Sequence, residues 1–211
     1  GRLVGRITVD DVMDEVREQA ERDYQLASGL SQDVETDDNV FRQTTARLPW
    51  LLIGMIGGIG NSMILGNFDS TFAAHPEMAL YIPLIGGTGG NVGTQSSALV
   101  VQGLANSSRN AENTFKQVLK ESVLALINAT IISMLVYIYN FIRFGATATV
   151  SYSVSISLFA VVMFASIFGT LVPMTLEKLK VDPAIATGPF ISITNDIIGM
   201  MMYMGITVLL S

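Results

Sequence analysis

The sequence has no cysteine and a single histidine, His75. A disulfide framework and a thiolate metal site are therefore excluded, and a zinc enzyme is disfavoured because zinc sites draw mainly on these two residue types. Charged residues make up only 14% of the chain, whereas soluble domains have about a quarter. With a net charge of −6, we expect no nucleic-acid partner.

The few charges are unevenly distributed along the chain. Residues 1–46 hold eleven Asp/Glu and five Lys/Arg, a net of −6, whereas residues 47–211 hold seven of each. We therefore expect an acidic segment joined near Arg47 to a segment of a different kind.

The part after Arg47 contains five long apolar stretches. A membrane-crossing helix needs about 20 mostly apolar residues. The five stretches are residues 48–68, 78–108, 122–142, 144–176 and 183–211, and their only charge is Asp196 in the last. A soluble core is the alternative, but so many uncharged runs leave no polar face to cover a globule. We expect an all-α integral membrane protein with five spans and lipid around it.

The basic residues in the short loops predict the orientation. With five crossings, seven Lys/Arg lie on the side of the N-terminus and Arg143 alone lies on the other. The seven are Arg42, Arg47, Arg109, Lys116, Lys120, Lys178 and Lys180. By the positive-inside rule, a multi-pass protein of the cell membrane with a cytoplasmic N-terminus and an outside C-terminus is expected. Between residues 144 and 157 the run Val-Ser-Tyr-Ser-Val-Ser-Ile-Ser alternates with period two, and we interpret this segment as an outer loop leading into the fourth span.

The acidic segment reads as a helix from Val12 to Ala27 followed by a loop over residues 33–38. Asp11, Glu15 and Glu18 recur along one helix face, with Asp14 beside them. Two readings stay open: a solvated helix with a linker, or a regulatory site for divalent cations, which relieve the repulsion among clustered carboxylates.

Two polar regions at membrane depth are candidate sites, because buried polar groups in a membrane are costly and usually functional. The first is residues 86–97, where five glycines lie within eight residues and Asn91, Thr94, Gln95 and Ser96 need partners or water. Closely packed helices explain the glycines. A thin-walled helix beside a wet pathway explains both the glycines and the polar residues.

The second region is residues 182–196. Pro189 removes a helical N–H and frees the carbonyl of Ile185, which predicts a broken helix lining a cavity. Asp182, Ile185, Pro189, Ser192 and Asp196 are spaced 3, 4, 3 and 4 apart, so we expect them on one helix face. The alternative for Asp196 is a structural acid that is protonated and hydrogen-bonded to a neighbour.

All donors in these regions are oxygens, which select hard cations: magnesium first, with manganese and calcium as further candidates. If two chains meet at a twofold axis, two Asp196 carboxylates together balance a divalent ion. Amide and hydroxyl groups suit contact with the water shell that magnesium keeps. We expect the pathway to be lined by Gly87, Gly90, Thr94, Ile185, Pro189 and Asn195.

Several motifs resemble the transmembrane domain of MgtE magnesium channels. They are Leu48-Pro49-Trp50-Leu51-Leu52, Pro83 with residues 87–96, Val181-Asp182-Pro183-Ala184, and Asn195-Asp196. Residues 1–16 look like the closing strand and helix of a CBS domain, residues 17–46 like an acidic plug or connecting helix and linker, and residues 47–211 like the five-span pore domain.

The resemblance implies a homodimer whose pore lies on the dimer axis, lined by spans two and five. It also implies that Asp196 holds hydrated magnesium, that Asn91 and the carbonyl of Ser192 assist, and that Asp182 sits at the cytoplasmic mouth. Magnesium bound among acids of preceding N-terminal and CBS cytoplasmic domains and the plug helix would close the pore. A divalent-cation channel or carrier is our first hypothesis; the rivals are an intramembrane enzyme using Asp196 and a non-conducting membrane scaffold. Aspartyl chemistry normally wants two close carboxylates, so we expect no enzyme.

Overall fold

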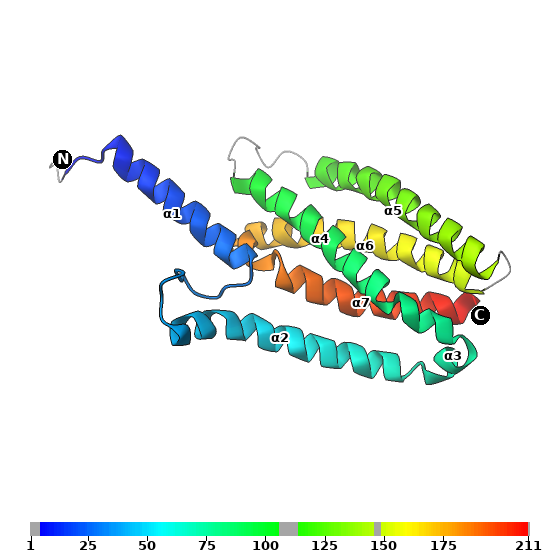
Figure 1. The fold of residues 1–211 in the computed structure, drawn as a ribbon. Coiled ribbons are helices and arrows are strands. Elements are labelled where there is room, and N and C mark those ends of the chain that lie inside the picture. The colour runs from blue at the N-terminus through cyan, green and yellow to red at the C-terminus, as the bar shows by residue number, and fades with distance from the viewer. Residues whose placement is uncertain (1–4, 106–113, 146–148, 211) are drawn as a thin grey trace.

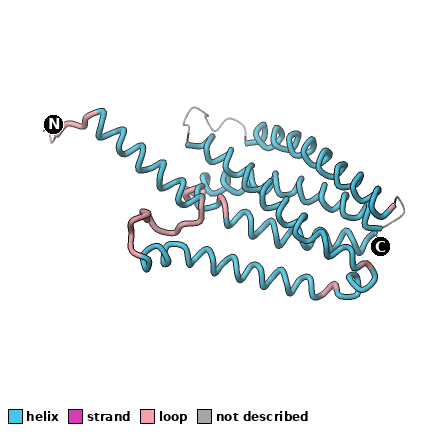
Figure 2. The backbone as a smooth tube through the Cα atoms, viewed as in Figure 1, coloured by secondary structure: helices cyan, strands magenta, loops and turns pink. Residues whose placement is uncertain are grey.

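The computed structural model describes residues 5–105, 114–145 and 149–210, and within these ranges every regular element is a helix (Figure 2). The predicted all-α class is therefore confirmed. The elements in chain order are α1 Val9–Ala27, α2 Val40–Gly66, α3 Asp69–Ala74, the 3-10 helix η1 Pro76–Tyr81, α4 Ile82–Ala105, α5 Thr114–Phe144, α6 Thr149–Lys178, the 3-10 helix η2 Pro183–Ala186 and α7 Pro189–Leu210.

Helix α1 starts at a reciprocal capping box. The Thr8 hydroxyl oxygen accepts a hydrogen bond from the Asp11 amide at 3.2 Å, and the Asp11 carboxylate accepts one from the Thr8 amide at 2.8 Å. The box satisfies two amides at the helix start, so the predicted helix begins at Val9 rather than Val12. It has no buried residue and projects away from the other helices (Figure 1).

The predicted loop over residues 33–38 is confirmed. Of the predicted CBS strand, residues 1–4 lie outside the described residues and residues 5–8 form no strand. Helix α1 runs through positions 16 and 17 without interruption, and α2 begins at Val40, before the predicted start of the membrane part.

Four of the described helices are long and apolar enough to cross a membrane. They are Val40–Gly66, Lys116–Phe144, Thr149–Lys178 and Pro189–Leu210, and they match predicted spans one, three, four and five. Helix α4 matches span two, of which residues 106–108 lie outside the description, as do Arg109 and Ser211. At 24 residues α4 is long enough to cross, but with its glycines, hydroxyls and amides it is not among the four helices that also have an apolar stretch long enough for a candidate span.

The start of α6 corrects the prediction for residues 144–157. An outer loop was expected there, but the chain is helical from Thr149, so that prediction is wrong over residues 149–157. Helix α6 is central and packs against α4, α5 and α7, and its serines let these neighbours approach from several directions. Three of their hydroxyls find acceptors inside the bundle: Ser151 on the carbonyl of Gly145 (2.8 Å), Ser153 on the Thr207 hydroxyl (3.1 Å) and Ser155 on the carbonyl of Ser151 (3.0 Å).

Helices α4 to α7 form a bundle, and α2 lies along α7 (Figure 1). The end of the bundle next to α1 holds the starts of α2, α5 and α7 and the ends of α4 and α6, whereas α3 and the C-terminus lie at the opposite end (Figure 1). The apolar core gathers toward that opposite end, around Met78, Val154, Leu158 and Tyr203. The Tyr203 hydroxyl there donates to the carbonyl of Met78 at 2.8 Å.

Candidate cation site

The turn before α7 sets the position of the Asp196 helix. Thr187 and Gly188 separate η2 from α7, and Gly188 has a φ of +62°, a conformation that favours glycine. Pro189 is the first residue of α7, where its missing N–H costs no hydrogen bond. The predicted break in the helix is confirmed, but it lies before Pro189 and is made by Gly188, not by a proline inside a helix.

This break corrects the predicted helix face over residues 182–196. Asp182 and Ile185 belong to the separate turn of η2, so the expected single stripe of five residues on one face is wrong. Asp182 caps η2 by accepting a hydrogen bond from the Ala184 amide at 2.9 Å, and it is exposed. Only Pro189, Ser192 and Asp196 of the stripe lie on α7.

Asp196 and Ser192 lie against two glycines of α4. A Cβ built on Gly86 would be 3.4 Å from Asp196 Oδ1, and one on Gly90 would be 3.5 Å from the same atom and 2.9 Å from Ser192 Oγ. Both pairs are four residues apart, so they meet along one helix face each. The absence of side chains on α4 therefore makes the space that Asp196 and Ser192 occupy.

The Asp196 carboxylate is partly buried. Among the described residues it makes no ion pair, and no group donates a hydrogen bond to it. The alternative that Asp196 is a structural acid hydrogen-bonded to a neighbour therefore has no support among the described residues. A lone carboxylate at this depth is costly without a counter-charge, and a cation supplies one.

The other predicted residues of α4 lie beside this contact. Asn91 and Gly87 are exposed, and a Cβ on Gly87 would meet nothing within 4 Å. Thr94 is partly buried on the following turn. Because Gly86 and Gly90 face α7, Gly87 and Asn91 point about 100° away around α4, toward the outside of this chain.

Asn195 turns into the interior instead. Its side chain is 1% exposed, and a Cβ on Gly93 would collide with its amide nitrogen. Neither amide atom has a hydrogen-bond partner among the described residues. Asn195 and Asp196 are neighbours in sequence, but within this chain they face different surroundings.

A cavity of about 590 Å³ lies beside the start of α7. Its lining comes from the linker after α1, from α2 and from α7: Ser28, Gly29, Leu30, Arg47, Trp50, Leu51, Gly54, Pro189, Ser192 and Ile193. Ser192 thus borders both this cavity and the Asp196 contact, so the two spaces lie next to each other.

The predicted regulatory acids stay on the surface of α1. Asp11, Asp14, Glu15 and Glu18 are all exposed. Hydrogen bonds from the Thr8 side chain and amide lower the pKa of Asp11, and Glu18 pairs with Arg22. In the described part of the chain, no three Asp, Glu or His residues are placed to hold a metal ion together.

Sequence reasoning missed one carboxylate, Glu121. It lies near the start of α5, where it accepts hydrogen bonds from Ser96 of α4 and Ser166 of α6. The nearby Lys116 and Lys120 made this segment read as a loop. The sequence did carry a signal, because Glu121 directly precedes a span and lies within helical reach of it.

Comparison of the sequence with known proteins identifies a family. The MgtE family model, described as a divalent cation transporter, matches residues 82–206, which run from the start of α4 into α7. The magnesium transporter MgtE of Bacillus subtilis is 34% identical over 204 residues, covering 97% of this chain and 45% of that protein. The magnesium transporter MgtE of Thermus thermophilus is 32% identical over 216 residues, covering 100% of this chain and 47% of that protein.

The chain thus spans about half the length of these relatives. The family match itself covers more than half of the 211 residues and includes both candidate polar regions. The chain belongs to the MgtE family of divalent cation transporters.

Proposed function

We propose that this chain is the membrane part of a magnesium channel or transporter that works as a homodimer. Magnesium passes between the two copies, along α4 and α7, through a pore on the dimer axis. In this arrangement α4 also crosses the membrane, as the second of five crossings in chain order. The observation that carries the proposal is the partly buried Asp196 carboxylate, which lies against Gly86 and Gly90 without a partner among the described residues.

The charge of that carboxylate matches the ion. Two copies related by a twofold axis supply −2, which balances one divalent cation. Magnesium gives up its water shell reluctantly, so Asp196 would contact bound water, with Asn91 and the carbonyl of Ser192 assisting. Magnesium is the first choice because both relatives described above are named magnesium transporters; manganese and calcium fit the same oxygen donors.

The exposed face of α4 supports a dimer. Gly87, Asn91 and Gln95 are exposed along one side of this helix, and amide groups are costly against lipid tails. A second copy with a water-filled pathway between them would give these groups suitable partners. The cavity beside Ser192 then serves as the approach to the pathway from the α1 end.

We further propose that the α1 end is cytoplasmic. Arg47, Lys120 and Lys180 lie on helix ends or turns at that end of the bundle, whereas Arg143 lies at the other end of α5. This distribution fits the positive-inside rule. The N-terminus would then be cytoplasmic and the C-terminus outside.

Contacts at the end of α1 support a role for this helix as a plug or connecting helix. A Cβ on Gly29 would be 2.6 Å from the Pro189 ring, and one on Gly188 would collide with the carbonyl of Ala27. The end of α1 therefore packs directly onto the start of the helix that carries Asp196. Binding of magnesium to acids on α1 and on preceding N-terminal and CBS domains would act through this contact.

The rival functions are less well supported. An aspartyl enzyme needs a second carboxylate near the first, and the other carboxylate described inside the bundle, Glu121, is bonded to Ser96 and Ser166 rather than to Asp196. A non-conducting scaffold would leave the unpaired carboxylate without a role. Membership of a transporter family favours permeation over both.

The test is magnesium uptake into proteoliposomes that contain the native chain, Asp196→Asn or the matched control Glu177→Gln, whose residue is exposed at the end of α6. Unit charges about 4 Å apart interact by about 4 kcal/mol at an effective dielectric constant of 20. We therefore expect Asp196→Asn to lower uptake more than about tenfold, a factor that corresponds to 1.4 kcal/mol. Native uptake by Asp196→Asn would refute the assignment, and a native chain that takes up no magnesium would favour the scaffold.

A further inference from the structure

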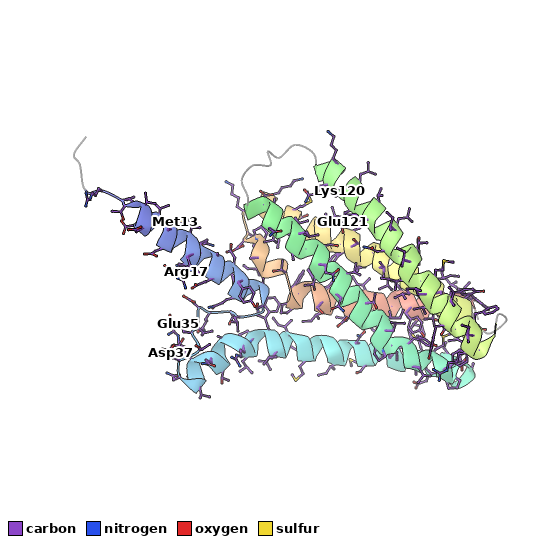
Figure 3. All side chains as sticks on the ribbon, turned by 45° about the horizontal axis from the view of Figure 1, so that its top comes forward. Met13, Arg17, Glu35, Asp37, Lys120 and Glu121 are labelled. Atoms are coloured by element: carbon purple, nitrogen blue, oxygen red, sulfur yellow. The ribbon has the colours of Figure 1, made fainter. Side chains whose placement is uncertain are left out.

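Glu121 joins three helices at one oxygen. It lies in the second turn of α5 next to the exposed Lys120, and Figure 3 labels both residues at that end of the helix. Its Oε1 accepts a hydrogen bond from Ser96 Oγ of α4 at 2.6 Å and one from Ser166 Oγ of α6 at 2.5 Å. The two serine oxygens are 3.1 Å apart, so the three side chains form one compact cluster, which we call the Glu121 clamp.

The two serines in the clamp are shielded from water. Ser96 is 5% exposed and Ser166 is 2% exposed. Neither hydroxyl could therefore hydrogen-bond to bulk water if the carboxylate were removed. Each serine has only one proton to donate, and both protons are directed at Glu121. Hydrogen bonds to an ionised acceptor are stronger than neutral ones, and without Glu121 the two hydroxyls would have to share a single weaker bond.

The clamp grips α4 from behind the proposed pathway. Ser96 follows Asn91 by five residues, which places it about 140° around the helix and about 7.5 Å along it. The clamp therefore lies on nearly the opposite side of α4 from the exposed face that carries Gly87 and Asn91. It pulls α4 toward α5 and α6 without entering the pathway.

Helix α4 needs such external support. Five glycines lie between positions 86 and 93, and each glycine weakens a helix relative to alanine. Another close contact between α4 and α6 is between backbones, because a Cβ on Gly169 of α6 would collide with the carbonyl of Gly93. That contact sets how near α4 and α6 come, but it is non-directional. The clamp adds directional bonds one turn further along.

We propose that Glu121 is a positioning residue for the cation pathway: its carboxylate fixes α4 against α5 and α6 so that Gly90 keeps its place against Asp196 and Asn91 keeps its place on the exposed face of α4. The inference rests on the proposed function, because it assumes that α4 lines the pathway. The position of α4 itself can nevertheless be measured without transport.

The experiment uses the full chain in proteoliposomes and two readouts. Magnesium uptake is measured for Glu121→Ala, Glu121→Gln, the double variant Ser96→Ala/Ser166→Ala, and the control Glu177→Gln. Because the native chain has no cysteine, Asn91→Cys adds a single thiol whose rate of labelling by a charged methanethiosulfonate reports on the position of α4.

We expect Glu121→Ala to lower uptake about tenfold and to change the labelling rate at position 91 several-fold. Changes of this size are expected because the variant removes two hydrogen bonds to a charged acceptor, which are stronger than neutral ones. Glu121→Gln keeps an oxygen acceptor and should recover most of both readouts. The serine double variant should resemble Glu121→Ala, and combining it with Glu121→Ala should add less than about twofold, because the three residues act as one unit. Glu177→Gln should behave as the native chain does.

Native uptake and native labelling in Glu121→Ala would overturn the proposal, and so would lost uptake with an unchanged labelling rate. If Glu121→Ala does not yield folded protein, Glu121→Gln and the serine double variant decide the matter by the same criteria. A native chain without uptake would contradict the proposed function, whereas the labelling rates would still support or overturn the clamp.

Discussion

Replacing Gly90 by alanine places one methyl group between α4 and α7 at Asp196. The new Cβ would lie 2.9 Å from Ser192 Oγ and 3.5 Å from Asp196 Oδ1. The first distance is shorter than folded proteins tolerate, so Ser192 must rotate or the two helices must separate. Either change moves the carboxylate from its place beside α4.

The expected cost follows from two opposing effects. Overpacking by a methyl group costs about 1–3 kcal/mol, while replacing glycine by alanine in a helix gains about 0.5–1 kcal/mol. Gly205→Ala is the matched control, because it lies on α7 and its Cβ would meet nothing within 4 Å. The difference between the two variants therefore isolates the overpacking cost.

The assay combines thermal unfolding with magnesium uptake for both variants. We expect Gly205→Ala to unfold at or above the native temperature and Gly90→Ala to unfold below Gly205→Ala by about 2–4 °C for each kcal/mol. Uptake should fall in Gly90→Ala and persist in Gly205→Ala. Equal stability and equal uptake of the two variants would refute the close packing of α4 on α7.

Two further predictions concern the α1 side of the molecule. Gly188→Ala should loosen α1 from α7, because the new side chain has a φ of +62° and lies against the end of α1. The backbone strain is about 1–2 kcal/mol. Faster proteolysis within residues 28–39 would show the loosening, and native resistance to proteolysis would contradict it. Thr8→Ala should speed hydrogen exchange of about the first turn of α1 at neutral pH. The stabilisation of the first turn by ionised Asp11 is present above the ordinary pKa of 3.8 and is lost as the pH falls through the lowered pKa of the folded state. The difference in exchange rate between Thr8→Ala and the native chain should therefore narrow in acid. An unchanged or wider difference would count against the capping box.

The long apolar runs and the acidic helix were predictable because each depends on composition over many residues. Span lengths follow from the thickness of the membrane, and α2, α5, α6 and α7 fall where the runs do. The start of α6 was not predictable in this way. Alternating serines suggest a strand or loop by period, but around a central helix small residues pack well on every side.

The site was predictable in its residue types and less so in its geometry. The glycines at 86 and 90 and the carboxylate at 196 were singled out from the sequence, and the structure brings them together. The continuous face from Asp182 to Asp196 was wrong because a single positive φ at Gly188 ends the periodicity on which spacing arguments depend. Glu121 was missed because its partners lie 25 and 45 positions away, a distance at which helical spacing gives no information.

The most direct test of the central claim is the location of a divalent cation relative to Asp196. Anomalous diffraction from crystals of the chain soaked in manganese, an oxygen-seeking stand-in for magnesium, would locate it. We expect a peak beside the Asp196 carboxylates, next to Gly86 and Gly90 of α4, and we expect competing magnesium to weaken it. Manganese bound only elsewhere, with the Asp196 side chain in contact with lipid or with dry helix surface, would contradict it.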